Sequence, residues 1–139
     1  MLETRKLLTH TAVLAMLEAA VGQAEAMGQP QCIVIVDASG GTLAELKMTG
    51  AKFLSLKSAR AKALTAASSG NPSSATPDAV RPAIAAATGG TMTGLPGGLP
   101  VIIEGQTIGG IGIGSGSGEQ DVAVANAALS VIGARLFQS

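Results

Sequence analysis

The sequence predicts an α+β fold in which helices flank a single antiparallel sheet of about five strands. Two pairs of apolar, β-branched segments are each joined by a short turn, at residues 37–41 and 104–106, and strands joined by short turns pair antiparallel. Helical segments precede, separate and follow these hairpins instead of alternating with single strands, which argues against a doubly wound parallel sheet. The expected order is α-β-β-α-α-β-β-β-α.

The N-terminal quarter predicts a helix followed by the first hairpin. Apolar residues recur there at helical spacing, and the stripe that they form includes the only histidine: Leu7, His10, Leu14, Leu17 and Val21. Thr4 can cap the start of this helix, and Gly28 stands just past its end. Residues 32–36 then form a continuous apolar strand, and residues 42–48 alternate as its partner.

The middle of the chain predicts a second helix over residues 53–68, with two different faces. One face is apolar and consists of Phe53, Leu56, Ala63, Leu64 and Ala67. The other face is small and weakly polar and consists of Ser55, Ser58, Lys62 and Thr65. Residues 70–82 carry three prolines and several hydroxyl side chains, which is typical of a loop. We expect a short helix from residue 77 to 88 and a short strand over residues 89–93.

The second hairpin contains a glycine-rich strand. Residues 101–103 and 107–113 are its two apolar runs, and glycines at positions 109, 110 and 112 leave much of the second run without side chains. Because glycine weakens a strand, this pattern indicates that another chain, a helix or a flat ligand packs directly on the backbone. Ser117 and Gln120 then have the form of a capping box that begins the final helix.

Composition favours one domain spanning residues 1–139 and excludes several classes of partner. Nine basic residues balance nine acidic ones, and the chain has no Trp, no Tyr and only two Phe, so neither a basic surface nor a base-stacking surface for nucleic acid is expected. No apolar run approaches the length of a membrane span, and the N-terminus is not a convincing secretion signal, so we expect a cytoplasmic protein without a membrane partner. Only 13% of residues are charged, which suits burial of surface in a homo-oligomer.

The glycine-rich run does not match a dinucleotide-binding motif. No position satisfies Gly-x-Gly-x-x-Gly, because a serine or glutamate falls where the third glycine is required. Residues 114–118 still lie between a strand and a helix, where free backbone N–H groups can hold a carboxylate or phosphate. Glu119 and Asp121 already supply negative charge to that first helical turn. We therefore favour a self-capped helix start over an anion site there.

Three side chains are candidates for chemistry. His10 lies within the predicted apolar stripe, where a packed core histidine is the more common case, although an axial haem ligand needs similar surroundings. Lys62 has no acid three or four residues away on its helix, so it suits recognition of a propionate or another small carboxylate, with a solvated lysine as the alternative. Lys62 and Asp37 are the plausible general acid or base groups.

Several segments in order resemble the GlcG/HbpS family of haem-binding-like proteins. They are residues 34–41, 47–51, 59–66, 97–101 and 108–114, followed by Glu119, Gln120 and Asp121. The resemblance implies an antiparallel sheet flanked by helices in a profilin-like order, assembly into homo-oligomers, and haem binding or degradation in one branch. In another branch it implies a place beside glycolate or other organic-acid catabolism. The family often has an acid where this chain has Thr49, so any role of that acid is lost here.

Three functions follow from these observations. The first is haem binding or handling, with haem as cofactor, His10 as the iron ligand and Lys62 as the propionate partner. The second is an enzyme or accessory protein for a small organic acid, and the third is a non-catalytic oligomeric partner of another protein. We expect the ligand pocket where the glycine strand meets the Lys62 helix, with these ligand-binding residues: Lys62, Thr65, Gly97, Gly98, Gly114 and Ser115.

Overall fold

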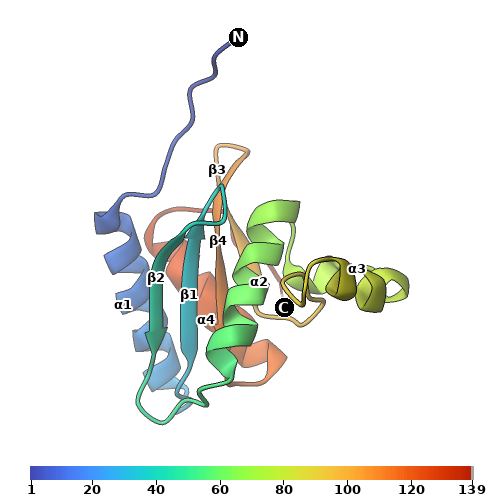
Figure 1. The fold of residues 1–139 in the computed structure, drawn as a ribbon. Helices are drawn as coiled ribbons and strands as arrows, with labels where there is room; N and C mark the ends of the chain where they lie inside the picture. The colour runs from blue at the N-terminus through green and yellow to red at the C-terminus, as the bar shows by residue number, and fades with distance from the viewer. Residues whose placement is uncertain (139) are drawn as a thin grey trace.

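The computed structural model describes residues 1–138, which form four α-helices and one four-stranded antiparallel sheet (Figure 1). The elements in chain order are α1 (His10–Ala26), β1 (Cys32–Asp37), β2 (Thr42–Lys47), α2 (Ser55–Ser69), α3 (Arg81–Ala87), β3 (Gly98–Ile103), β4 (Gln106–Gly114) and α4 (Gly118–Val131). The strands lie in the order β2-β1-β4-β3, and each neighbouring pair is antiparallel. The predicted α+β class and both hairpins are confirmed, with four strands instead of about five.

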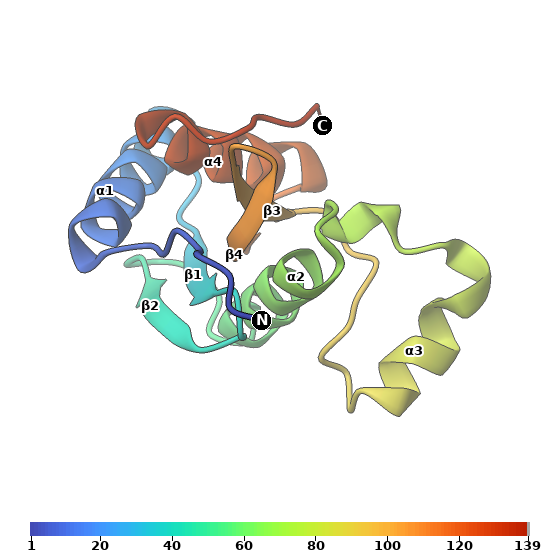
Figure 2. The same cartoon turned by 90° about the horizontal axis from the view of Figure 1, so that it is seen from above.

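The sheet separates two layers of helix, as Figure 2 shows. Helices α1 and α4 pack against each other on one face, and α2 covers the other. The larger core lies under α1 and α4, where the sheet contributes Ile33, Ile35, Leu99, Val101, Ile111 and Ile113. Met16 of α1 and Leu129 of α4 are fully buried against it, and burial of such a side chain contributes about 1.5–3 kcal/mol.

The glycine-rich strand β4 is covered by a helix of the same chain. A Cβ on Gly112 would overlap the carbonyl oxygen of Ala59, and one on Gly110 would overlap that of Ala63, so α2 lies directly on the backbone of β4. Ala59 and Ala63 are fully buried at this contact. Of the three occupants that the sequence allowed for this strand, an internal helix is the one that the structure has.

Helix α1 begins later, and faces another way, than the sequence predicts. Its cap is Thr9 and not Thr4, because the Thr9 hydroxyl accepts a hydrogen bond from the Ala12 amide. The buried positions of the helix are Val13, Met16, Ala20 and Ala24. Leu7 and Leu14 are 75% and 62% exposed. The predicted phase is wrong because small alanines such as Ala20 and Ala24 allow α1 to pack closely against α4, which leaves the larger Leu14 on the outer side.

The segment between α2 and β3 also differs from the prediction. Residues 89–93 form turns and not a strand, and the helix expected over residues 77–88 is a 3-10 turn followed by the short α3. Segment 78–90 is largely exposed and projects away from the sheet beyond α2 (Figure 2). Residues 91–93 instead lie against α2, because the Thr65 hydroxyl donates to the carbonyl of Thr91 and accepts from the amide of Thr93. These tertiary contacts override the β propensity of the two threonines.

The predicted start of α4 is confirmed. The Ser117 hydroxyl accepts from the Gln120 amide, and the Gln120 side chain accepts from the Ser117 amide. Within residues 1–138, no helix is long and apolar enough to cross a membrane. The same residues bring together no cluster of three or more His, Cys, Asp or Glu side chains that could hold a metal ion.

Candidate ligand site around Lys62 and Asp121

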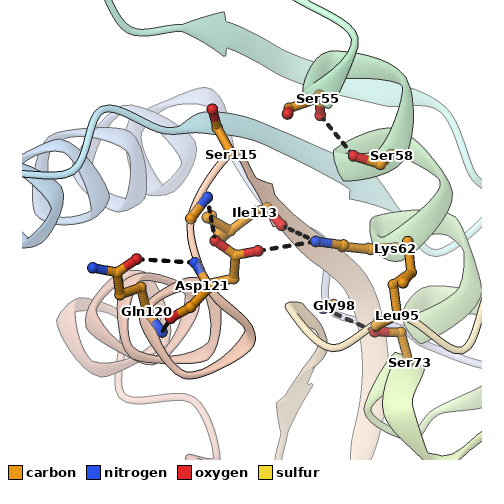
Figure 3. A network of polar contacts seen from close by, with 12 residues as sticks. Ser55, Ser58, Lys62, Ser73, Leu95, Gly98, Ile113, Ser115, Gln120 and Asp121 are labelled. Atoms are coloured by element: carbon orange, nitrogen blue, oxygen red, sulfur yellow. Dashed lines mark hydrogen bonds and ion pairs between the residues drawn. The ribbon is translucent and has the colours of Figure 1, made fainter. Parts of the chain in front are cut away.

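Lys62 and Asp121 form a buried ion pair that joins α2 to the first turn of α4 (Figure 3). Lys62 Nζ lies 3.0 Å from Asp121 Oδ2 and donates a second hydrogen bond of 2.7 Å to the carbonyl oxygen of Ile113 at the end of β4. Lys62 is only 5% exposed and Asp121 2%. The expectation of an unpaired lysine is therefore wrong, because its partner comes from another helix, 59 residues along the chain.

Glycines at the start of β3 make room for this pair. Gly97 has φ of 119°, and a Cβ there would lie 2.8 Å from Asp121 Cβ and 3.1 Å from Lys62 Nζ. A Cβ on Gly98 would overlap the carbonyl oxygen of Lys62. Both glycines thus lie beside the predicted site, and their role in this structure is to let α2, α4 and β4 approach one another.

Burial sets the electrostatics of Asp121. Removal from water raises the pKa of its carboxyl, and the Lys62 ammonium and the amide of Gly116 partly offset that effect. The Gly116 amide donates to Asp121 Oδ1 over 3.1 Å. Both carboxylate oxygens therefore have partners, as a buried charge requires.

A pocket of about 300 Å³ opens beside the ion pair. Hydroxyl and charged side chains from α2, the turn before it, the β4–α4 connection and the first turn of α4 dominate its wall: Lys52, Ser55, Ser58, Lys62, Ser115 and Asp121. Figure 3 shows the two α2 serines and Ser115 on the side of the pair that faces away from β3. Gly114, the last residue of β4, is in close contact with the first residue of α2. A Cβ on Gly114 would lie 2.7 Å from the carbonyl oxygen of Ser55.

Ser115 has an uncommon backbone conformation, with φ of 92°. Its hydroxyl accepts a hydrogen bond of 3.0 Å from the Lys52 amide, and its carbonyl accepts one of 3.0 Å from the Gln29 side chain. A residue other than glycine in this region carries strain of about 1–3 kcal/mol. The contacts of Ser115 hold the turn before α2 against the β4–α4 connection.

Thr65 and Asp37 lie away from this pocket. Thr65 is buried, its hydroxyl donates to the carbonyl of Ala61 over 2.7 Å, and it accepts from the Thr93 amide over 3.0 Å. It lines a separate cavity of about 420 Å³ that also includes Met92. Asp37 accepts hydrogen bonds from the amides of Ser39 and Gly41 and so holds the β1–β2 turn.

His10 lies far from Lys62. It is the first residue of α1 and is exposed, so its expected position in a buried stripe is wrong. His10 lies at the N-terminal end of α1, whose 17 residues span roughly 25 Å. The opposite end is the one near the pocket, because Gln29, just past the C-terminus of α1, donates a hydrogen bond to the carbonyl of Ser115. The structure therefore does not bring the predicted iron ligand and the predicted propionate partner together within one chain.

Lys62 and Ser115, two of the expected ligand-binding residues, line this pocket together with Asp121 and Lys52, which the sequence pattern does not point to. A lysine on a helix without an acid one turn away requires a distant partner once the lysine is buried. Periodicity cannot identify that partner.

Comparisons with known proteins agree with this fold. The family model described as haem degrading protein HbpS-like matches residues 8–130. The crystal structure of the PduOC:heme complex has a TM-score of 0.88 at 29% identity, covering 96% of this chain and all of that one. The crystal structure of HbpS has a TM-score of 0.83 at 34% identity, covering 94% of each chain.

Two curated relatives come from Citrobacter freundii. Corrinoid adenosyltransferase PduO is 34% identical over 86% of this chain, but the chain spans only 37% of PduO. An uncharacterized 15.0 kDa protein encoded between dhaT and dhaS is 33% identical over 88% of this chain and 89% of its own length. With the family match over nearly all of the described residues, this chain belongs to the HbpS-like haem-degrading protein family.

Proposed function

We propose that this protein binds haem. The observation that carries the proposal is the likeness over the whole domain to PduOC, which was crystallised as a complex with haem. The HbpS-like family match supports the same ligand. Family membership alone does not supply a site, because function depends on particular side chains.

His10 is the candidate iron ligand in this proposal. It is the only histidine of the chain, and its imidazole is accessible at the start of α1. Leu14 lies one turn further along the same side of the helix, and both Leu14 and Leu7 are largely exposed. An apolar surface around an accessible imidazole suits a haem macrocycle. Lys62 is buried, paired and remote, so it does not serve a haem held by His10 of the same chain.

Met92 is the alternative donor. Met92 lines the cavity of about 420 Å³ between α2, the β1–β2 turn and residues 88–92, and methionine is a known axial ligand of haem. That cavity is the second place at which the macrocycle could lie against this chain.

A hemin titration followed by the Soret band tests both haem binding and the identity of the iron ligand. The unmodified protein should shift the band, His10→Ala should weaken binding and change the spectrum, and Met92→Leu should leave both unchanged. The reverse result for the two variants would move the iron to Met92 and keep the function. A protein that does not shift the Soret band at all would contradict haem binding.

We also propose that the protein assembles into a homo-oligomer. Large apolar side chains are exposed on α1 and on the segments that precede α1, α2 and β3: Leu7, Leu14, Phe53, Leu54 and Leu95. Exposed apolar surface of this kind is a common feature of interfaces. Sedimentation velocity over a range of protein concentrations tests this, and a monomer throughout that range would contradict it.

A further inference from the structure

The two outer strands of the sheet, β3 and β2, differ in how their free edges are protected. The edge of β3 is closed by its own chain. The Gly98 amide donates to the Ser73 hydroxyl over 2.9 Å, and Pro100 has no amide hydrogen. The carbonyl of Ile102 accepts from the Arg135 amide over 3.1 Å. Protection of this kind prevents another strand from pairing with an edge.

The free edge of β2 lacks such protection within residues 1–138. β1 is its only neighbour in the sheet, and Figure 2 shows β2 at the outer end. The Met48 amide donates to the carbonyl of Gln31 over 3.0 Å, and backbone groups alternate in direction along an antiparallel strand, so Leu46 also faces β1. The amides and carbonyls of Glu45 and Lys47 therefore point away from the sheet. No loop or turn in residues 1–138 supplies them with a backbone partner.

The sequence of β2 is complementary to itself in the antiparallel direction. Glu45 and Lys47 are two residues apart, so their side chains lie on the same face of the strand. When a second β2 pairs antiparallel with Leu46 opposite Leu46, each Glu45 lies opposite Lys47 of the other copy. Opposite charges directly across a ladder attract, and like charges repel. The two neighbouring registers that the outward backbone groups allow would place Glu45 opposite Glu45 or Lys47 opposite Lys47, so charge selects the register centred on Leu46.

Both charged side chains are available for this pairing. Arg60 of α2 donates to Glu45 Oε2 over 3.2 Å, which holds the carboxylate on the α2 side of the strand and leaves Oε1 without a partner among residues 1–138. The Glu45 side chain is 40% exposed. Lys47 is exposed as well, and its Nζ makes a long contact of 3.5 Å to the carbonyl of Ala51. Neither charge is fully satisfied within its own chain.

The other face of β2 offers an apolar surface along the same edge. A hollow of about 540 Å³ lies between the C-terminal half of α1 and β2, and its apolar wall includes Val21, Leu46 and Met48. In the register centred on Leu46, Ala44 of the second copy lies opposite Met48, and the two copies of Leu46 face each other. Apolar side chains thus meet on this face, while the charged pairs form on the α2 side.

We propose that two copies of this chain associate through β2, pairing antiparallel about Leu46 so that their sheets form one continuous sheet. The inference rests on the homo-oligomer proposed above and assigns it an interface. A second copy is the partner because one register satisfies the outward backbone groups, both charges and the apolar face together. The interface is separate from the haem proposal, since His10 and Met92 are not part of β2.

Charge reversal on either side of the proposed pair tests the interface. Lys47→Glu places acids opposite each other, and Glu45→Lys places lysines opposite each other. Each variant alone should raise the Kd of self-association, measured by sedimentation equilibrium, about tenfold or more. An equimolar mixture of the two variants restores opposite charges and should associate about as tightly as the unmodified protein. A mixture that sediments as the sum of the two separate variants would overturn the pairing through β2.

Lys6→Glu is the matched control. It makes the same charge change at the opposite end of the sheet, where Lys6 Nζ lies 3.5 Å from Glu104 of the β3–β4 turn, and should leave association unchanged. An oligomer that none of these variants weakens would overturn the β2 interface and leave the homo-oligomer standing. A protein that is monomeric at every concentration would overturn both.

Amide hydrogen exchange of the unmodified protein provides a test that needs no variant. The outward amides of Glu45 and Lys47 should gain protection as protein concentration rises, because each donates to the other copy. The Leu46 amide, which faces β1, should be protected at every concentration. Fast exchange of the residue 45 and 47 amides in the associated protein would show that another surface forms the interface.

Discussion

Lys62 Nζ and Asp121 Oδ2 lie 3.0 Å apart and connect the helices on opposite faces of the sheet. The ion pair lies beside the end of β4, where Lys62 also donates a hydrogen bond to the carbonyl of Ile113. It therefore unites α2, α4 and the sheet at the place where the glycines of β3 and β4 allow close approach.

Removal of one charge should destabilise the fold. Asp121→Asn keeps the shape and an acceptor for the Gly116 amide but leaves the Lys62 ammonium buried without an anion. Because burial raises the pKa of Asp121, the cost of desolvating its carboxylate offsets much of the attraction to Lys62. We expect a loss of about 1–3 kcal/mol in the free energy of unfolding, measured with urea. The double variant Lys62→Met, Asp121→Leu should recover most of that loss, because it buries no charge. A loss below about 1 kcal/mol for the single variant would contradict this role of the pair.

The pair should also give a pH dependence. Because burial raises the pKa of Asp121 above its ordinary value, the folded state takes up a proton more readily than the unfolded state. The contribution of Asp121 to stability is thus largest below its unfolded pKa and decreases as pH rises through its folded pKa. Urea unfolding of the unmodified protein and Asp121→Asn, compared across the acid range, checks this. If the contribution of Asp121 to stability grew with pH instead, the attraction of Lys62 would have a larger effect on the pKa of Asp121 than burial has.

Two glycines offer a matched test of helix packing on the sheet. Gly112→Ala places a methyl group on the carbonyl oxygen of Ala59, so α2 must shift, and we expect a loss of more than about 3 kcal/mol. A methyl group on Gly22 of α1 would have no neighbouring atom within 4 Å, and Gly22→Ala should stabilise by about 0.5–1 kcal/mol. Urea unfolding measures both, and similar effects at the two positions would contradict the packing described.

Cys32 should be unreactive in the folded protein. It is fully buried on the α2 side of β1, and burial raises the pKa of its thiol. The thiolate, which is the reactive form, is therefore scarce at neutral pH. Labelling with a thiol reagent should be slow without denaturant and should become fast with urea, in parallel with unfolding. Fast labelling of the folded protein would show that this region of the sheet opens.

Local patterns in the sequence identified most of the secondary structure. The two hairpins, the capping box at Ser117 and Gln120 and the glycine strand depend on residues that are close in the chain, and each is confirmed. The phase of α1 was not predictable in the same way. Its buried face includes Ala20 and Ala24, which fit beneath α4, while the larger Leu14 faces outward.

The α+β class, the antiparallel hairpins and the family resemblance follow from the order of residues alone. What covers β4, which face of α1 is buried and which acid pairs with Lys62 depend on the folded arrangement. Those outcomes depend on contacts between residues far apart in the chain, such as Lys62 and Asp121. Hydrophobic periodicity and turn chemistry describe a few residues at a time, whereas burial and ion pairing depend on how complete elements meet in space.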